Sequence, residues 1–96
     1  MSPQNKKKID SLRKQLDKLD NDLLEIFKKR TRIIKQVLGL KEYKKQIVDK
    51  KRINKILSNI KKKSIKNNID PKITNRIWKN MIWSYIDFEK RNFKKK

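Results

Sequence analysis

Residues 12–30 read LRKQLDKLDNDLLEIFKKR, and they lie in a longer stretch, residues 4–38, in which almost nothing breaks a helix. Apolar residues recur there with the seven-residue period of a coiled coil, in two columns. One column holds Ile9, Leu16, Leu23 and Val37, and the other holds Leu12, Leu19, Ile26, Ile33 and Leu40. The pattern predicts one long amphipathic helix over about residues 5–40.

The length of this helix indicates that the chain forms an oligomer. About 35 residues at about 1.5 Å each give a length of roughly 50 Å. A compact chain of this size has a radius of gyration of only about 12–13 Å. Because such a helix extends beyond its own domain, it needs a partner, and a second copy of the chain is the simplest one. We therefore expect a homodimer.

Two shorter helices are predicted after Gly39, the only glycine. The polar run 42–46 indicates a loop, and Asp49 can cap a helix over about 49–66. The apolar stripe of that helix is Ile53, Ile56, Leu57 and Ile60. The pair Asp70-Pro71 is a start signal for a third helix over about 71–93. Its expected buried face is Ile73, Ile77, Trp78, Met81, Ile82, Tyr85 and Ile86.

The whole pattern is that of an all-α protein. No strand-type alternation is present, so we expect three helices (long, short and medium) in one domain, residues 1–96. The lysines at 94–96 are expected to fray.

Composition excludes several classes of function. The chain contains no Cys and no His, which rules out a disulfide framework, a thiolate metal site and any His-based triad. It lacks the roughly 18 consecutive apolar residues of a membrane span, and its basic start is not followed by the apolar run of a signal peptide. We expect a cytoplasmic protein that uses no metal and no cofactor and does not bind a membrane.

The net charge of +20 has two interpretations. It indicates either a basic helical module that binds nucleic acid, or a genome bias that places Lys on solvated faces. Only six of the 30 basic residues are Arg, whereas phosphate-binding surfaces favour Arg. We favour the bias and expect no nucleic-acid partner, although the charge should still attract an anionic substrate.

Two charged residues interrupt apolar faces. Arg30 occupies the column of Leu16 and Leu23, and Glu89 follows Ile82 and Tyr85 on one face of the third helix. A charge on an apolar seam is costly unless it meets an opposite charge. Arg30 is therefore either a structural residue, in an ion pair or setting the register of a coiled coil, or part of an anion-binding site. Glu89 either pairs with a neighbouring Lys or has a functional role.

The same positions resemble those of a known family, the all-helical (AroQ-type) chorismate mutases. The family opens its first helix with a Leu-Arg start, an Asp about seven residues on, and an Arg seventeen residues after the first. Here these are Arg13, Asp20 and Arg30, and a Lys eleven residues later is Lys41. The segment IVDKKR supplies the loop motif, with Asp49 and Arg52. The segment WSYIDFEK supplies Tyr85 and Glu89 in the third helix.

The resemblance, over about residues 9–93, implies an intertwined helical homodimer that rearranges chorismate to prephenate. By carry-over, Arg13 of the other subunit and Arg30 would bind the two carboxylates, and Lys41 would donate to the ether oxygen. Glu89 would donate to the same oxygen, which requires that its carboxyl be protonated. The remaining substrate-binding residues would be Asp49, Arg52 and Tyr85.

One departure from the family keeps an alternative open. The family usually has Glu directly after the second-helix Arg, where it binds the ring hydroxyl, but here the residue is Ile53. Isochorismate-pyruvate lyases, which share the fold and the basic cluster, also carry an apolar residue at this position. The alternative function is therefore the elimination of pyruvate from isochorismate to give salicylate.

Overall fold

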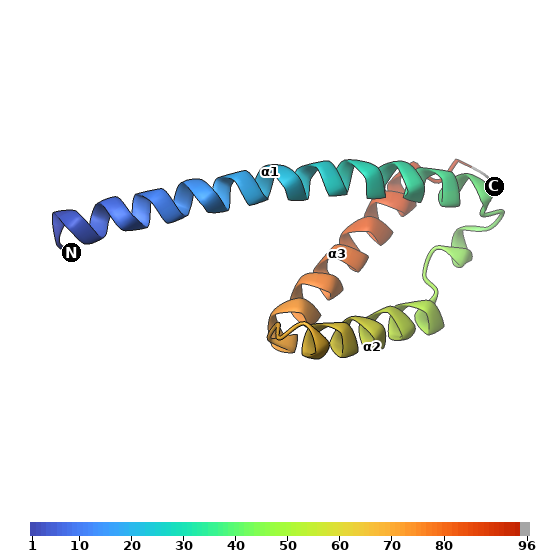
Figure 1. Cartoon of the computed structure of the whole chain (residues 1–96). Coiled ribbons are helices and arrows are strands. Elements are labelled where there is room, and N and C mark those ends of the chain that lie inside the picture. The colour runs from blue at the N-terminus through green and yellow to red at the C-terminus, as the bar shows by residue number, and fades with distance from the viewer. Residues whose placement is uncertain (95–96) are drawn as a thin grey trace. The chain divides into compact units, whose positions relative to one another are not determined.

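The computed structural model describes residues 1–94, so two of the three tail lysines, residues 95 and 96, lie outside the described part. It has three α-helices, α1 (Pro3–Leu40), α2 (Lys50–Lys66) and α3 (Pro71–Asn92), and a short 3-10 helix, η1 (Lys44–Gln46) (Figure 1). Residues 1–94 contain no strand, and the predicted all-α class with a long, a short and a medium helix is confirmed. No helix in this range is long and apolar enough to cross a membrane.

The chain divides into two compact units, residues 1–33 and residues 34–96. The first unit is helical from Pro3 onwards. This start is two residues earlier than residue 5, because the Ser2 hydroxyl accepts a hydrogen bond from the Asn5 N–H at 3.1 Å and Pro3 takes the first helical position. None of residues 1–33 is buried. The apolar columns are exposed by half or more at Leu12, Leu16, Leu19, Leu23, Ile26 and Ile33.

The second unit is built on the pairing of α2 with α3. Asp49 caps α2 by accepting from the Arg52 N–H at 3.0 Å, and Asp70 caps α3 by accepting from the Lys72 N–H at 2.9 Å. Both caps agree with the start signals in the sequence. Between the helices, Asn68 takes the left-handed conformation, with φ 57°, which Asn tolerates better than most residues.

A buried pair of hydroxyls joins the two helices near this turn. The Oγ of Ser64 and the Oγ1 of Thr74 lie 2.7 Å apart, and the Ser64 hydroxyl also donates to the Ile60 carbonyl at 2.6 Å. Thr74 is buried here, while Ile73 and Ile77 are more than half exposed. Within a single chain, the predicted buried face of α3 is therefore not covered at Ile73 and Ile77, while Thr74 meets Ser64 of α2.

The apolar core of this unit is small. Leu38 near the end of α1, Ile47 after η1 and Ile86 in α3 are its buried members. Val48, Ile53, Ile82 and Phe93 pack against it and are partly buried. This core joins the end of α1, the loop after it and the end of α3.

Candidate functional site

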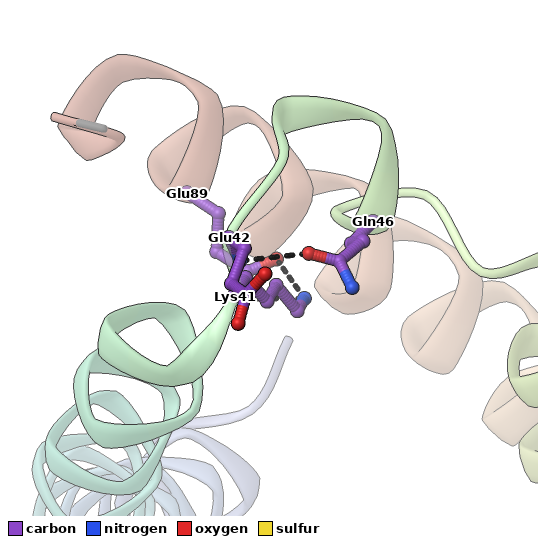
Figure 2. Close-up of polar contacts among 4 residues, drawn as sticks. All are labelled: Lys41, Glu42, Gln46 and Glu89. Atoms are coloured by element: carbon purple, nitrogen blue, oxygen red, sulfur yellow. Dashed lines mark hydrogen bonds and ion pairs between the residues drawn. The ribbon is translucent and has the colours of Figure 1, made fainter. Parts of the chain in front are cut away.

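Lys41 and Glu89 form an ion pair beside the core (Figure 2). The Lys41 Nζ lies 3.2 Å from Oε1 and 3.4 Å from Oε2 of Glu89. The Glu89 side chain is 8% exposed and that of Lys41 is 19% exposed. A pair held this far from water is screened much less than a surface pair, so its charges act strongly on a nearby ligand.

The core explains why residues 48 positions apart in the sequence meet. Lys41 follows Leu38 by three residues, and Glu89 follows Ile86 by three. In a helix a step of three stays on the same face, and the Lys41 N–H still donates to the Leu38 carbonyl at 3.2 Å. Packing of Leu38 and Ile86 in one core therefore brings the two charged ends together.

The loop after Lys41 is held by the side chain of Gln46. Its Oε1 accepts from the backbone N–H of Glu42 and from that of Tyr43, each at 2.8 Å, and Figure 2 shows the bond toward Glu42 beside the ion pair. Sequence analysis missed this residue. A Gln three residues after the N-cap of a short helix resembles a capping box, but here the N-cap is Tyr43, where that motif has Ser or Thr.

An open depression in the surface, about 650 Å³ in volume and called the cavity below, lies next to this loop. It is lined by Lys41, Gln46, Val48, Asp49 and Lys50. Its volume lies within the roughly 300–1,000 Å³ that is usual for small-molecule sites. The lining offers the ammonium groups of Lys41 and Lys50, the amide of Gln46 and the carboxylate of Asp49. One oxygen of that carboxylate, Oδ1, already caps α2. Such a cavity suits an anionic ligand that also carries a hydroxyl group.

The other predicted site residues are distributed between the two units. The structure brings Lys41, Glu89 and Asp49 into one region of the second unit. Arg52 at the start of α2 is exposed and does not line the cavity as residues 1–94 define it. Tyr85 is half-buried on α3, where its ring packs edge-to-face on Phe88 with 6.4 Å between centroids.

Arg13 and Arg30 belong to the first unit. Both are exposed on α1, and neither forms an ion pair with another residue in the described range 1–94. Within the described chain, no carboxylate therefore offsets the cost of placing the Arg30 charge on an apolar column. Both guanidinium groups are available to an anionic ligand or to a second protein chain.

The arrangement around Lys41 can bind an anion and stabilise negative charge on one of its oxygens. It contains no His and no Cys, because the sequence has neither. The ammonium of Lys41 is positioned as a fixed hydrogen-bond donor, which is the geometry that lowers the energy of a charge developing in a transition state. Chemistry that needs only binding, orientation and charge stabilisation is within reach of these residues.

Comparison with known protein families identifies the chain's relatives. The sequence profile of the family described as chorismate mutase type II matches residues 12–90, which is most of the 96-residue chain. The matched range contains every residue that the sequence analysis assigned to the site. No curated protein and no solved structure matches the chain.

Proposed function

The chain belongs to the chorismate mutase type II family, and on that premise we propose that it converts chorismate to prephenate in the biosynthesis of phenylalanine and tyrosine. Members of the family are intramolecular isomerases. The observation that carries the proposal for this chain is the buried Lys41–Glu89 pair beside a cavity of suitable size. It supplies a fixed cation where an ether oxygen would gain charge.

The reaction is a Claisen rearrangement within one molecule, so it needs neither a nucleophile nor a general base. Rate acceleration comes from holding the chair-like conformer and from stabilising charge on the ether oxygen as its bond to carbon breaks. Lys41 donates to that oxygen, and Glu89, which forms an ion pair with Lys41, holds the ammonium beside it. Asp49, which lines the cavity, accepts from the substrate hydroxyl.

The two carboxylates of the substrate require cations that the cavity lining does not supply alone. Arg30 and Arg13 suit them, because a guanidinium binds a carboxylate through two parallel hydrogen bonds. By the family resemblance, Arg52 and Tyr85 complete the binding residues. In this proposal Arg13 comes from a second subunit.

The homodimer is supported by the apolar columns of α1. Leu16 and Leu19 are 57% exposed, and Leu23 and Ile26 are 50% exposed. An isolated helix gains little stability in water, and its stability in proteins comes from burying an apolar face. A second copy of the same heptad columns would cover these residues, as in a coiled coil.

A second candidate function rests on Ile53. This side chain is half-buried and packs against the core. Because it is aliphatic, it offers no polar group to a ring hydroxyl. The isochorismate-pyruvate lyases resemble this chain in that respect. Elimination of pyruvate from isochorismate is therefore the alternative, and it uses the same cationic cavity.

One experiment separates the two candidates. The purified protein is incubated with chorismate or with isochorismate, and prephenate and salicylate are followed by chromatography. We expect prephenate from chorismate as the dominant product. Salicylate from isochorismate would favour the lyase, and the absence of both products would turn attention to nucleic-acid binding at several salt concentrations.

An amide at position 89 tests the contribution of Glu89. The Glu89→Gln variant keeps an oxygen for the Lys41 ammonium and adds an N–H donor, which a carboxylate lacks. Its kcat/KM should equal or exceed that of the wild type, because the amide can donate to the ether oxygen as that oxygen gains charge.

Initial rates of prephenate formation, measured at matched ionic strength, test this expectation. The exposed Glu42→Gln variant in the adjoining loop is the matched control and should keep the wild-type rate. Loss of most of the activity in a folded Glu89→Gln variant would contradict this expectation, because it would show that the charge of Glu89 is required.

A further inference from the structure

The backbone of the loop fixes the orientation of the Gln46 side-chain amide at the cavity. Two backbone N–H groups, those of Glu42 and Tyr43, point at its amide oxygen from 2.8 Å. An amide nitrogen cannot accept either bond, so rotation of the amide by half a turn would place N–H against N–H. The oxygen must therefore face the loop, and the NH₂ group must face away from the two N–H groups.

That NH₂ group has no partner within the part of the chain that the structure describes. No buried side-chain nitrogen or oxygen in residues 1–94 lacks a hydrogen-bond partner, and Gln46 itself is exposed and lines the cavity together with Lys41 and Asp49. Figure 2 shows the amide oxygen of Gln46 bonded toward Glu42. The donor is oriented in advance of ligand binding.

We propose that Gln46 is a ligand-binding residue of this site, which donates its amide N–H to a carboxylate oxygen of the bound substrate. The inference rests on the proposed function, which supplies a substrate with two carboxylates and a hydroxyl. A neutral donor beside Lys41 and Lys50 adds a directed hydrogen bond to the attraction of the two charges. Because the loop holds the amide in place, little side-chain entropy is lost when the ligand binds.

The charge of the ligand gives Gln46 a specificity role. Lys41 is engaged with Glu89, and the Asp49 carboxylate repels a ligand carboxylate and attracts a hydroxyl. Gln46 is the uncharged donor of the lining, and it accommodates a carboxylate without adding further charge. The geometry therefore favours a ligand that places a carboxylate near Gln46 and a hydroxyl near Asp49.

The test uses two substitutions that distinguish the contribution of the amide oxygen from that of the amide nitrogen. Gln46→Glu keeps an acceptor for the N–H groups of Glu42 and Tyr43 but replaces the donor with a negative charge. Gln46→Met has nearly the same length and keeps neither function. Gln4→Met, an exposed Gln in the first turn of α1, is the matched control for the loss of a surface amide.

We expect KM for chorismate to rise about tenfold in Gln46→Met and more in Gln46→Glu, since one hydrogen bond to a charged group corresponds to about a tenfold change in affinity. kcat should fall less than KM rises in Gln46→Glu, because its loop is still held. The dissociation constant of prephenate, measured by isothermal titration, should rise in parallel. Gln4→Met should match the wild type in both quantities, and thermal melting should confirm that all variants are folded.

Wild-type KM and prephenate affinity in folded Gln46→Glu, with an active wild-type enzyme, would overturn the assignment of Gln46 and leave the proposed function intact. Equal losses in Gln46→Met and Gln4→Met would overturn it as well. A wild-type protein that forms no prephenate and binds none would instead overturn the proposed function, and the inference with it.

Discussion

Replacing Lys41 with Met is expected to lower kcat/KM for chorismate by about a hundredfold to a thousandfold, the range found when one donor to a developing oxyanion is removed. The physical reason is that the Nζ of Lys41 is the cation placed beside both the cavity and Glu89. Steady-state formation of prephenate at saturating and limiting substrate measures the loss. A Lys44→Met variant, in the same loop and exposed, should retain nearly full activity.

Stability has to be separated from catalysis in this experiment. Lys41→Met leaves the carboxylate of Glu89, which is 6% exposed as a residue, without its counter-charge, and a lone buried charge is destabilising. The double variant Lys41→Met/Glu89→Gln removes that charge. It should recover the thermal stability lost in the single variant but none of the activity, and recovery of activity in the double variant would refute Lys41 as the essential donor.

Mixing two inactive variants is expected to restore activity. In the proposed dimer, Arg13 serves the site that contains Lys41 of the other subunit. An Arg13→Ala chain and a Lys41→Met chain, unfolded together in urea and refolded, form heterodimers in which one of the two sites is intact. Half of the dimers are heterodimers in a random mixture, so prephenate formation should reach about a quarter of the wild-type rate per chain.

The matched control pairs Arg30→Ala with Lys41→Met. Arg30 and Lys41 serve the same site of one subunit in the proposal, so both sites of this heterodimer carry a defect and no recovery is expected. Recovery with the Arg30 pair, or its absence with the Arg13 pair when sedimentation shows dimers, would contradict the assignment of Arg13 to the partner. The two mixtures contain the same Lys41 variant, so differences in its folding cannot explain the contrast.

Much of the fold could be predicted because its signals are local. A stretch free of helix breakers with heptad columns predicts α1, and the caps at Asp49 and Asp70 predict where α2 and α3 begin. The contacts between α2 and α3 could not be predicted in full. Apolar periodicity gave no sign of the buried hydroxyl pair, because Thr74 is buried only where Ser64 of α2 offers it a partner.

The site was predictable to a different extent. Lys41 and Glu89 stood out through the family resemblance and through the position of Glu89 on an apolar stripe, and the structure joins them. Gln46 gave no periodic signal, because its function depends on side-chain bonds to the backbone of an irregular loop. The place of Arg13 at the substrate stays a prediction, because a second chain would supply it. The place of Arg30 also stays a prediction, because Arg30 belongs to the first unit and Lys41 to the second.

None of the first 33 residues is buried within the described chain. Whether this segment is ordered therefore depends on the concentration of its partner. In the proposed dimer, the helix gains its stability only on meeting another copy, so its folding depends on protein concentration and the free energy of unfolding has no value per isolated chain. Dilution should lower the helical signal and the rate per chain together, because both report the same association. The cell could therefore set the activity of this protein through its abundance.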